Sequence, residues 1–84
     1  MLKKVLITGA SGGIGEQLAK KFHDEGYFVI LSGRNSSRLQ KVTKSFKKNF
    51  DIFSCDLDSS KDIKVFCKNI ENKHKRVDIL INNA

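Results

Sequence analysis

The sequence contains no proline, and no part of its 84 residues has the composition of a linker or of a low-complexity segment. Hydrophobic residues make up 39% and charged residues 30%, a balance typical of a globular chain and not of a disordered one. We therefore expect a single domain. A domain of this length buries only about two-thirds of the surface that its unfolded chain exposes, so we expect marginal stability unless its open faces are covered.

Long apolar runs are also absent. The longest is Tyr27–Leu31, whereas a helix that spans a bilayer needs about 20 consecutive apolar residues. The first residues, MLKKVLITGAS, lack the hydrophobic region of a secretory signal peptide. We therefore expect a cytoplasmic protein with no membrane partner.

Cysteine and histidine are scarce, with two of each. Cys55 and Cys67 form no close-spaced pair, and two ligands do not make a structural zinc site. A disulfide is not expected in a reducing compartment, so we expect two buried or half-buried thiols and no metal. His23 and His74 each stand beside charged residues in a predicted helix, and we expect both on the solvated surface.

Acidic residues are few relative to basic ones: 9 Asp and Glu stand against 16 Lys and Arg, a net charge of +7. Such a balance can mark a nucleic-acid-binding protein. The lysines are spread over the chain, however, and the one denser stretch, Arg38 to Lys48, has no nucleic-acid-binding signature. We expect a solvated helix face or weak attraction to an anionic ligand. The weakest alternative, a nucleic-acid-binding remnant, predicts oligonucleotide binding that falls steeply with salt.

What the sequence does contain is a regular alternation of apolar and amphipathic segments. The apolar segments, read as strands, are KKVLIT (3–8), YFVILSG (27–33), FDIFSCDL (50–57) and VDILINN (77–83). The helices predicted between them have apolar residues at helical spacing, and each has a capping residue at one end. These are Ile14, Leu18 and Phe22 before a Gly26 cap, Leu39, Val42 and Phe46 after an Asn35 or Ser36 cap, and Ile63, Phe66, Cys67 and Ile70 after a Ser59–Asp62 capping box.

This βαβαβαβ order with short connections predicts an α/β fold, a parallel sheet with helices on both faces. Right-handed crossovers restrict the topology further, and we expect the strand order 3-2-1-4. That order is most of a Rossmann-type doubly wound sheet, here partial, with four strands and three helices. The fourth strand is then an exposed apolar edge, which proteins normally cover.

Four glycines crowd the segment between the first strand and the first helix, Thr8 to Gly15, with the spacing Thr-Gly-x-x-x-Gly-x-Gly. Such a turn places the helix N-terminus and its unpaired N–H groups at the carboxyl edge of the sheet, where phosphate oxygens bind. Gly9 permits the tight exit from the strand, an unsubstituted Gly13 lets a pyrophosphate approach, and Gly15 lets the helix pack on the strand. A phosphate-binding loop of the NTPase type needs a lysine after the last glycine, and Glu16 occupies that position, so the sequence excludes such a loop.

The segment Thr8 to Gly15 resembles the cofactor signature of the short-chain dehydrogenase/reductase family. Three further segments match that family in order and spacing: Ser32-Gly33-Arg34, Cys55-Asp56-Leu57 and Asn82-Asn83-Ala84. The resemblance implies that residues 1–84 are the N-terminal part of one NAD(P)-binding Rossmann domain, with no second domain. It implies cofactor contacts at Gly9, Ser11, Gly12, Gly13, Ile14 and Gly15 in the turn, at Asp56 and Leu57 for the adenine, and at Asn82 and Ala84 for the adenosine ribose region.

The end of the second strand bears on the choice of dinucleotide. An NAD-selective site places a carboxylate there, but Gly33 occupies the matching position and Arg34 follows it. A guanidinium pairs with a 2′-phosphate through two hydrogen bonds, and Ser32 and Asn35 add neutral ones. A second NADP signal of the family, a basic residue before the second motif glycine, is replaced by Gly12. We expect NADP(H) to be preferred over NAD(H).

Catalytic residues are missing from the pattern. The family's hydride transfer relies on a Tyr-x-x-x-Lys pair with an upstream Ser and an Asn on a later helix. The only tyrosine, Tyr27, is followed four residues on by Leu31, so we assign no catalytic residue. The resemblance implies that this chain is a portion of an oxidoreductase and is inactive alone. Its origin is expected to be a truncated gene product, a split gene product or a chain cut after the fourth strand. Besides the dinucleotide, the expected partners are a complementing C-terminal half or a homo-oligomer that covers the fourth-strand edge.

Overall fold

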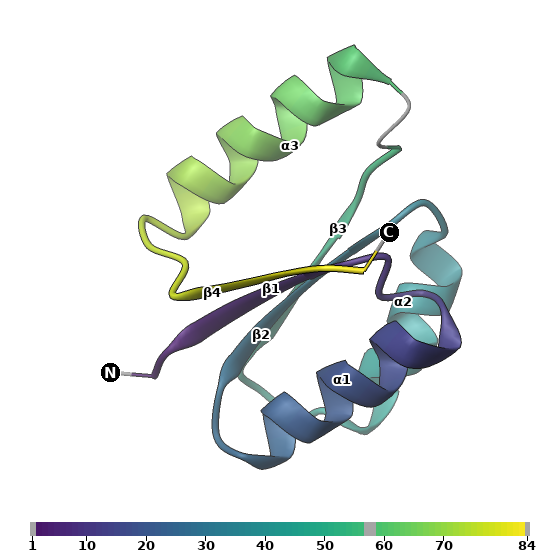
Figure 1. Ribbon diagram of the computed structural model, residues 1–84, viewed down its shortest axis with the longest axis vertical. Coiled ribbons are helices and arrows are strands. Elements are labelled where there is room, and N and C mark those ends of the chain that lie inside the picture. Colours follow the sequence, from purple (N-terminus) through teal and green to yellow (C-terminus); the bar gives the residue numbers. More distant parts are fainter. Residues whose placement is uncertain (1, 57–58, 84) are drawn as a thin grey trace.

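A computed structural model describes residues 2–56 and 59–83. Its elements, shown in Figure 1, are β1 (Lys4–Thr8), α1 (Gly13–Asp24), β2 (Phe28–Gly33), α2 (Ser36–Val42), a 3-10 turn η1 (Thr43–Ser45), β3 (Phe50–Ser54), α3 (Ser60–Lys73) and β4 (Ile79–Asn82). The strands are parallel in the order β3-β2-β1-β4, which confirms the expected partial Rossmann-type topology. None of the helices formed by these residues has the length and apolarity needed to span a bilayer.

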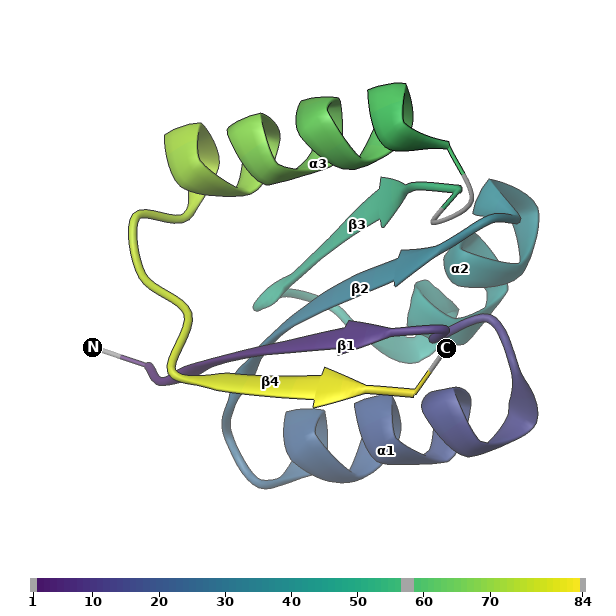
Figure 2. The same cartoon turned by 45° about the horizontal axis from the view of Figure 1, so that its top comes forward.

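The main core lies between the sheet and the two helices α1 and α2, on the face opposite α3 (Figure 2). Successive strand residues point to opposite faces, so Val5 and Ile7 of β1 and Val29 and Leu31 of β2 all enter this core. The helices contribute Ala19, Leu39 and Val42, and Phe46 closes the layer beyond α2. The predicted apolar positions of α2 are therefore confirmed as core residues. Asn35 is the cap: its Oδ1 accepts the Arg38 N–H at 3.1 Å.

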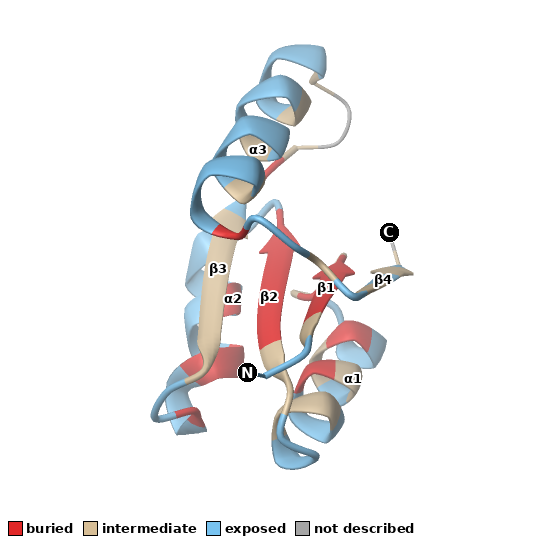
Figure 3. Ribbon diagram, turned by 90° about the vertical axis from the view of Figure 1, so that its left-hand side faces the viewer, coloured by how far each residue is buried: buried red, intermediate tan, exposed pale blue. Residues whose placement is uncertain are grey.

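The other face of the sheet is covered less completely, as the exposure colours of Figure 3 show. None of the residues of α3 is buried, and Val65 is 53% exposed. The predicted apolar face of α3 does turn inward, since Phe66 lies 6.0 Å from Phe53 between ring centroids, but it is only half-buried. On the same side, Leu80 of the edge strand β4 is 63% exposed. The open apolar edge expected at the fourth strand is thus confirmed.

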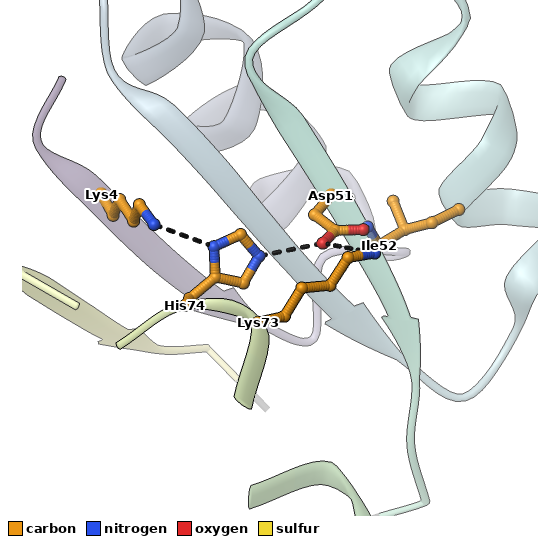
Figure 4. A network of polar contacts seen from close by, with 5 residues as sticks. All are labelled: Lys4, Asp51, Ile52, Lys73 and His74. Carbon is orange, nitrogen blue, oxygen red and sulfur yellow. Dashed lines mark hydrogen bonds and ion pairs between the residues drawn. The ribbon is translucent and has the colours of Figure 1, made fainter. Parts of the chain in front are cut away.

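His74 is buried, with 6% of its surface exposed, so the expectation of a solvated side chain is wrong. The chain turns back toward the sheet as α3 ends, and the His74 N–H donates to the Ile70 carbonyl at 2.7 Å. The imidazole then lies over β2, between side chains of β1 and β3 (Figure 4): Nδ1 is 3.1 Å from Lys4 Nζ and Nε2 is 2.9 Å from Asp51 Oδ2. Since an ammonium only donates, Nδ1 accepts from Lys4 and the Nε2–H donates to Asp51. Lys73 pairs with the same carboxylate at 3.2 Å.

His23 also differs from the expectation. It is half-buried, its ring is stacked on Phe46 with centroids 4.0 Å apart, and its Nε2 lies 2.8 Å from the Lys48 carbonyl oxygen. Both histidines were assigned to the surface because their sequence neighbours are charged. Their actual contacts come from distant segments, which the crossovers bring to the helix ends.

The two thiols differ in exposure: Cys55 is buried and Cys67 is exposed, so the expectation of two covered thiols is wrong for Cys67. Burial raises the pKa of the Cys55 thiol, and the carboxylates of Asp62 and Asp56 raise it further.

We expect Ellman's reagent to modify Cys67 rapidly in the native protein and Cys55 about 100-fold more slowly, in line with an opening free energy of about 3 kcal/mol. Stopped-flow absorbance on Cys67→Ala and Cys55→Ala, each retaining one thiol, measures both rates. Equal rates would contradict the burial of Cys55.

Candidate glycine-turn site for a dinucleotide

The turn from β1 into α1 lies at the carboxyl edge of the sheet, where the strand arrows of Figure 2 end. Gly9 leaves the strand with a φ of +63°, a conformation that side chains disfavour. The Gly12 N–H donates to the Gly9 carbonyl at 3.3 Å, and the Ala10 N–H donates to the Ser32 carbonyl of β2 at 2.9 Å. The turn is therefore held on two strands, and α1 begins at Gly13 with its first N–H groups at this edge.

Gly13 and Gly15 lie in the same helical turn but meet different surroundings. A Cβ on Gly15 would lie 2.5 Å from the Gly9 carbonyl oxygen and 2.7 Å from the Ala10 Cα, so only glycine fits between α1 and the turn. This confirms the predicted close packing. A Cβ on Gly13 would have no heavy atom within 4 Å, and Ile14 beside it is 70% exposed. The turn therefore has room for a ligand beside Gly13.

The end of β4 is tied to the same turn. Thr8 Oγ1 lies 3.2 Å from Asn82 Oδ1 and 3.4 Å from the Ile81 carbonyl oxygen, and it accepts the Asn83 N–H at 3.1 Å. Asn83 Nδ2 donates to the Gly9 carbonyl at 3.3 Å. Thr8 therefore serves the structure of the turn. Asn83 was not among the predicted site residues, although it lies in the segment Asn82-Asn83-Ala84 that carries part of the family resemblance.

The end of β2 presents Arg34 and Asn35 as exposed residues at the same edge, whereas Ser32 is buried. Ser32 thus has little surface to offer a ligand, and the Asn35 side chain is engaged as the cap of α2. Arg38 and Lys41 of α2 belong to the dense basic stretch Arg38 to Lys48, although they were not among the predicted cofactor residues, and they add positive charge nearby. They line an open hollow between α1 and α2, together with Ser11, Gly13, Glu16 and Val42.

At the end of β3, Asp56 is half-buried and its N–H donates to Asp62 Oδ2 at 3.3 Å. The Asp62 N–H in turn donates to Ser59 Oγ at 3.2 Å, which confirms Ser59 as the cap of α3. The turn glycines, Arg34, Asp56 and Asn82 all follow or end strands that finish at one edge of the sheet. Leu57 and Ala84 lie outside the described residues, so the contacts predicted for them stay predictions.

Tyr27 does not belong to this edge. It precedes β2 at the opposite end of the strand, and its ring packs edge-on against Phe22 with centroids 5.0 Å apart. Its N–H donates to the Phe22 carbonyl at 3.0 Å, in the turn that ends α1. The tyrosine is therefore part of the packing between α1 and β2.

A parallel sheet ordered β3-β2-β1-β4, with a glycine turn from β1 into the N-terminus of α1, defines a partial Rossmann-type α/β fold. A family model described as short chain dehydrogenase matches residues 3–84. The chain belongs to the short-chain dehydrogenase/reductase family.

Individual relatives agree with this assignment. The chain is 43% identical over 82 residues to the 3-oxoacyl-[acyl-carrier-protein] reductase FabG of Rickettsia conorii, covering 98% of this chain and 32% of that protein. Among solved structures, a metagenomic short-chain oxidoreductase in complex with NADP is 33% identical with a TM-score of 0.89, over 98% of this chain and 38% of the other. An actinorhodin polyketide ketoreductase with NADPH is 29% identical with a TM-score of 0.88, over 99% of this chain and 33% of the other. The chain spans about a third of the length of the curated relatives it matches.

Proposed function

We propose that this chain is the NADP(H)-binding N-terminal portion of a short-chain oxidoreductase, with NADP(H) preferred over NAD(H). The observation that carries the proposal is the end of β2: Gly33 offers no carboxylate, and the exposed Arg34 follows it at the same sheet edge as the glycine turn. Solved relatives that hold NADP and NADPH support the same choice.

The residues at this edge fit the adenosine diphosphate half of such a cofactor. The first N–H groups of α1 would hold the diphosphate, beside the unobstructed side of Gly13. Arg34 would bind the 2′-phosphate, Asp56 the adenine amino group and Asn82 the adenosine ribose. The bound cofactor would supply the hydride, and these residues would orient it without donating a proton to a substrate. We therefore expect binding without turnover by this chain alone, and we expect the reactive groups in polypeptide that corresponds to the remaining length of the relatives.

Calorimetric titration tests the proposal directly. We expect NADPH to bind more tightly than NADH by about tenfold or more, since a charge-assisted hydrogen bond contributes about 1.5–3 kcal/mol. Arg34→Ala is expected to remove this preference by weakening NADPH alone. The matched control is Arg76→Ala, which removes the same charge beside Asp78, at the amino end of the sheet. Equal affinity of the unmodified chain for the two cofactors would contradict the preference, and absence of binding would contradict the site.

The open edge of the sheet favours a second candidate, a half-enzyme that is completed by a separate chain. Leu80 on β4 and Val65 on α3 are large exposed apolar side chains on the incompletely covered part of the fold. We expect a mixture of this chain with the C-terminal two-thirds of the Rickettsia reductase to oxidise NADPH when a ketoester substrate is added. The measurement is the fall in NADPH absorbance. Leu80→Lys is expected to prevent this while leaving NADPH affinity unchanged. If the mixture is inactive, the half-enzyme hypothesis is contradicted, and an enzyme made of one continuous chain is favoured.

A further inference from the structure

Ser11 in the glycine turn and Gly33 at the end of β2 lie side by side at the carboxyl edge. A Cβ on Gly33 would lie 3.0 Å from Ser11 Oγ and 3.4 Å from Ser11 Cβ. It would also lie 3.4 Å from Cδ2 of Leu39, a fully buried core residue. A Cβ at position 33 would therefore be tight against Ser11 Oγ, which must shift by a few tenths of an ångström, and in van der Waals contact with Ser11 Cβ and the Leu39 side chain.

The backbone around this pair has little freedom to make space. The Ala10 N–H donates to the Ser32 carbonyl at 2.9 Å, which holds the turn on β2. The Cys55 N–H donates to the Gly33 carbonyl at 2.9 Å, which holds the end of β2 on the segment after β3. Rotation of the Ser11 side chain can move its Oγ, and its Cβ and Leu39 Cδ2 then leave a new Cβ at van der Waals distance, with no spare room on that side.

Position 33 is also where a carboxylate would select NAD by binding the ribose hydroxyls and repelling a 2′-phosphate. We propose that Ser11 is a second determinant of cofactor selectivity, because its side chain occupies the space that a carboxylate at position 33 would need. This inference rests on the proposed NADP(H)-binding function. Ser11 acts here through Gly33 and is a positioning residue. Its side chain also lines the hollow between α1 and α2, whose charged residues are Arg38, Lys41 and Glu16.

The consequence is that Gly33→Asp does not by itself convert the site to NAD. We expect this variant to lose NADPH affinity, to gain no NADH affinity, and to melt about 4–8 °C lower, as overpacking does in a domain of this length. In the double variant Ser11→Gly with Gly33→Asp, we expect most of that loss in melting temperature to disappear and NADH to bind about tenfold more tightly than in Gly33→Asp. Ser11→Ala with Gly33→Asp, which keeps the Cβ and removes the Oγ, is expected to fall between the two.

The experiment combines titration with NADPH and NADH with thermal unfolding followed by circular dichroism. Ser45→Gly with Gly33→Asp is the matched control, since Ser45 is an exposed serine in η1, away from the end of β2. If Gly33→Asp alone binds NADH as well as the double variant does, Ser11 is not a determinant, although the proposed function stands. If the unmodified chain binds neither cofactor, the proposed function fails. The melting temperatures still decide the inference: equal losses from Gly33→Asp with and without the Ser11→Gly substitution would overturn it.

Discussion

Replacing Gly15 with alanine is expected to lower the free energy of unfolding by about 3 kcal/mol or more and to abolish dinucleotide binding. The new Cβ would lie 2.5 Å from the Gly9 carbonyl oxygen and 2.7 Å from the Ala10 Cα. Both contacts are with backbone in a turn held on two strands, so no flexible side chain can move aside. A domain of this length has a total stability of about 4–12 kcal/mol, so the loss is a large fraction of it. Urea unfolding followed by circular dichroism measures it.

Gly13→Ala is the matched control, because Gly13 lies in the same helical turn and a Cβ there meets nothing within 4 Å. Alanine is a better helix former than glycine by about 1 kcal/mol, so this variant is expected to keep or gain stability. Under the proposed function it still weakens NADPH binding, since the methyl group holds the diphosphate away from the backbone. If both variants unfold at the same urea concentration, the close packing of α1 on the turn is not what requires glycine at position 15.

Leu31→Ala is expected to cost about 2–5 kcal/mol of unfolding free energy, the range measured for large-to-small changes in cores. Leu31 has no exposed surface and lies on the central strand β2, between the two neighbouring strands β1 and β3 and under the helices. Its truncation leaves a cavity bounded by Val5, Val29 and Leu39 and the other members of the main core, which relax only partly. The measurement is the shift of the urea midpoint at constant slope.

The comparison variant is Leu80→Ala, which removes the same atoms from the exposed edge strand β4. Its expected effect is within about 0.5 kcal/mol, as for most surface substitutions. Similar losses from the two variants would mean that a second copy of the chain covers the edge strand in solution, and would favour the homo-oligomer over the half-enzyme. A small loss from Leu31→Ala would contradict the described core.

Much of the fold was predictable because its signals are local. Each buried strand is a short apolar run, and the helices carry apolar residues at helical spacing with Asn35 and Ser59 as caps. Boundaries were less predictable. The third strand was expected over residues 50–57, and β3 ends at Ser54, where Cys55 turns its N–H toward the Gly33 carbonyl. The end of a strand depends on its neighbour's length, which no local pattern records.

In the site, too, features with a local sequence signal were predicted, and features that depend on distant residues were not. Gly9 and Gly15 were assigned their roles from spacing, and the structure confirms both, by a positive φ and by close backbone contacts. The hydrogen bond by which Asn83 stabilises the turn was not predicted, because its partner Gly9 lies 74 residues away in the sequence. His74 was misplaced for a similar reason, since its partners Lys4 and Asp51 lie on strands far from it in the sequence.

The sequence by itself determined the order of strands and helices, the glycine turn and the absence of a carboxylate at position 33, since each depends on residue type and near neighbours. Only the tertiary structure decided which side chains share space. The contact of Ser11 with position 33, the burial of His74 and the exposure of Leu80 all follow from parallel crossovers, which bring together segments that are distant along the chain.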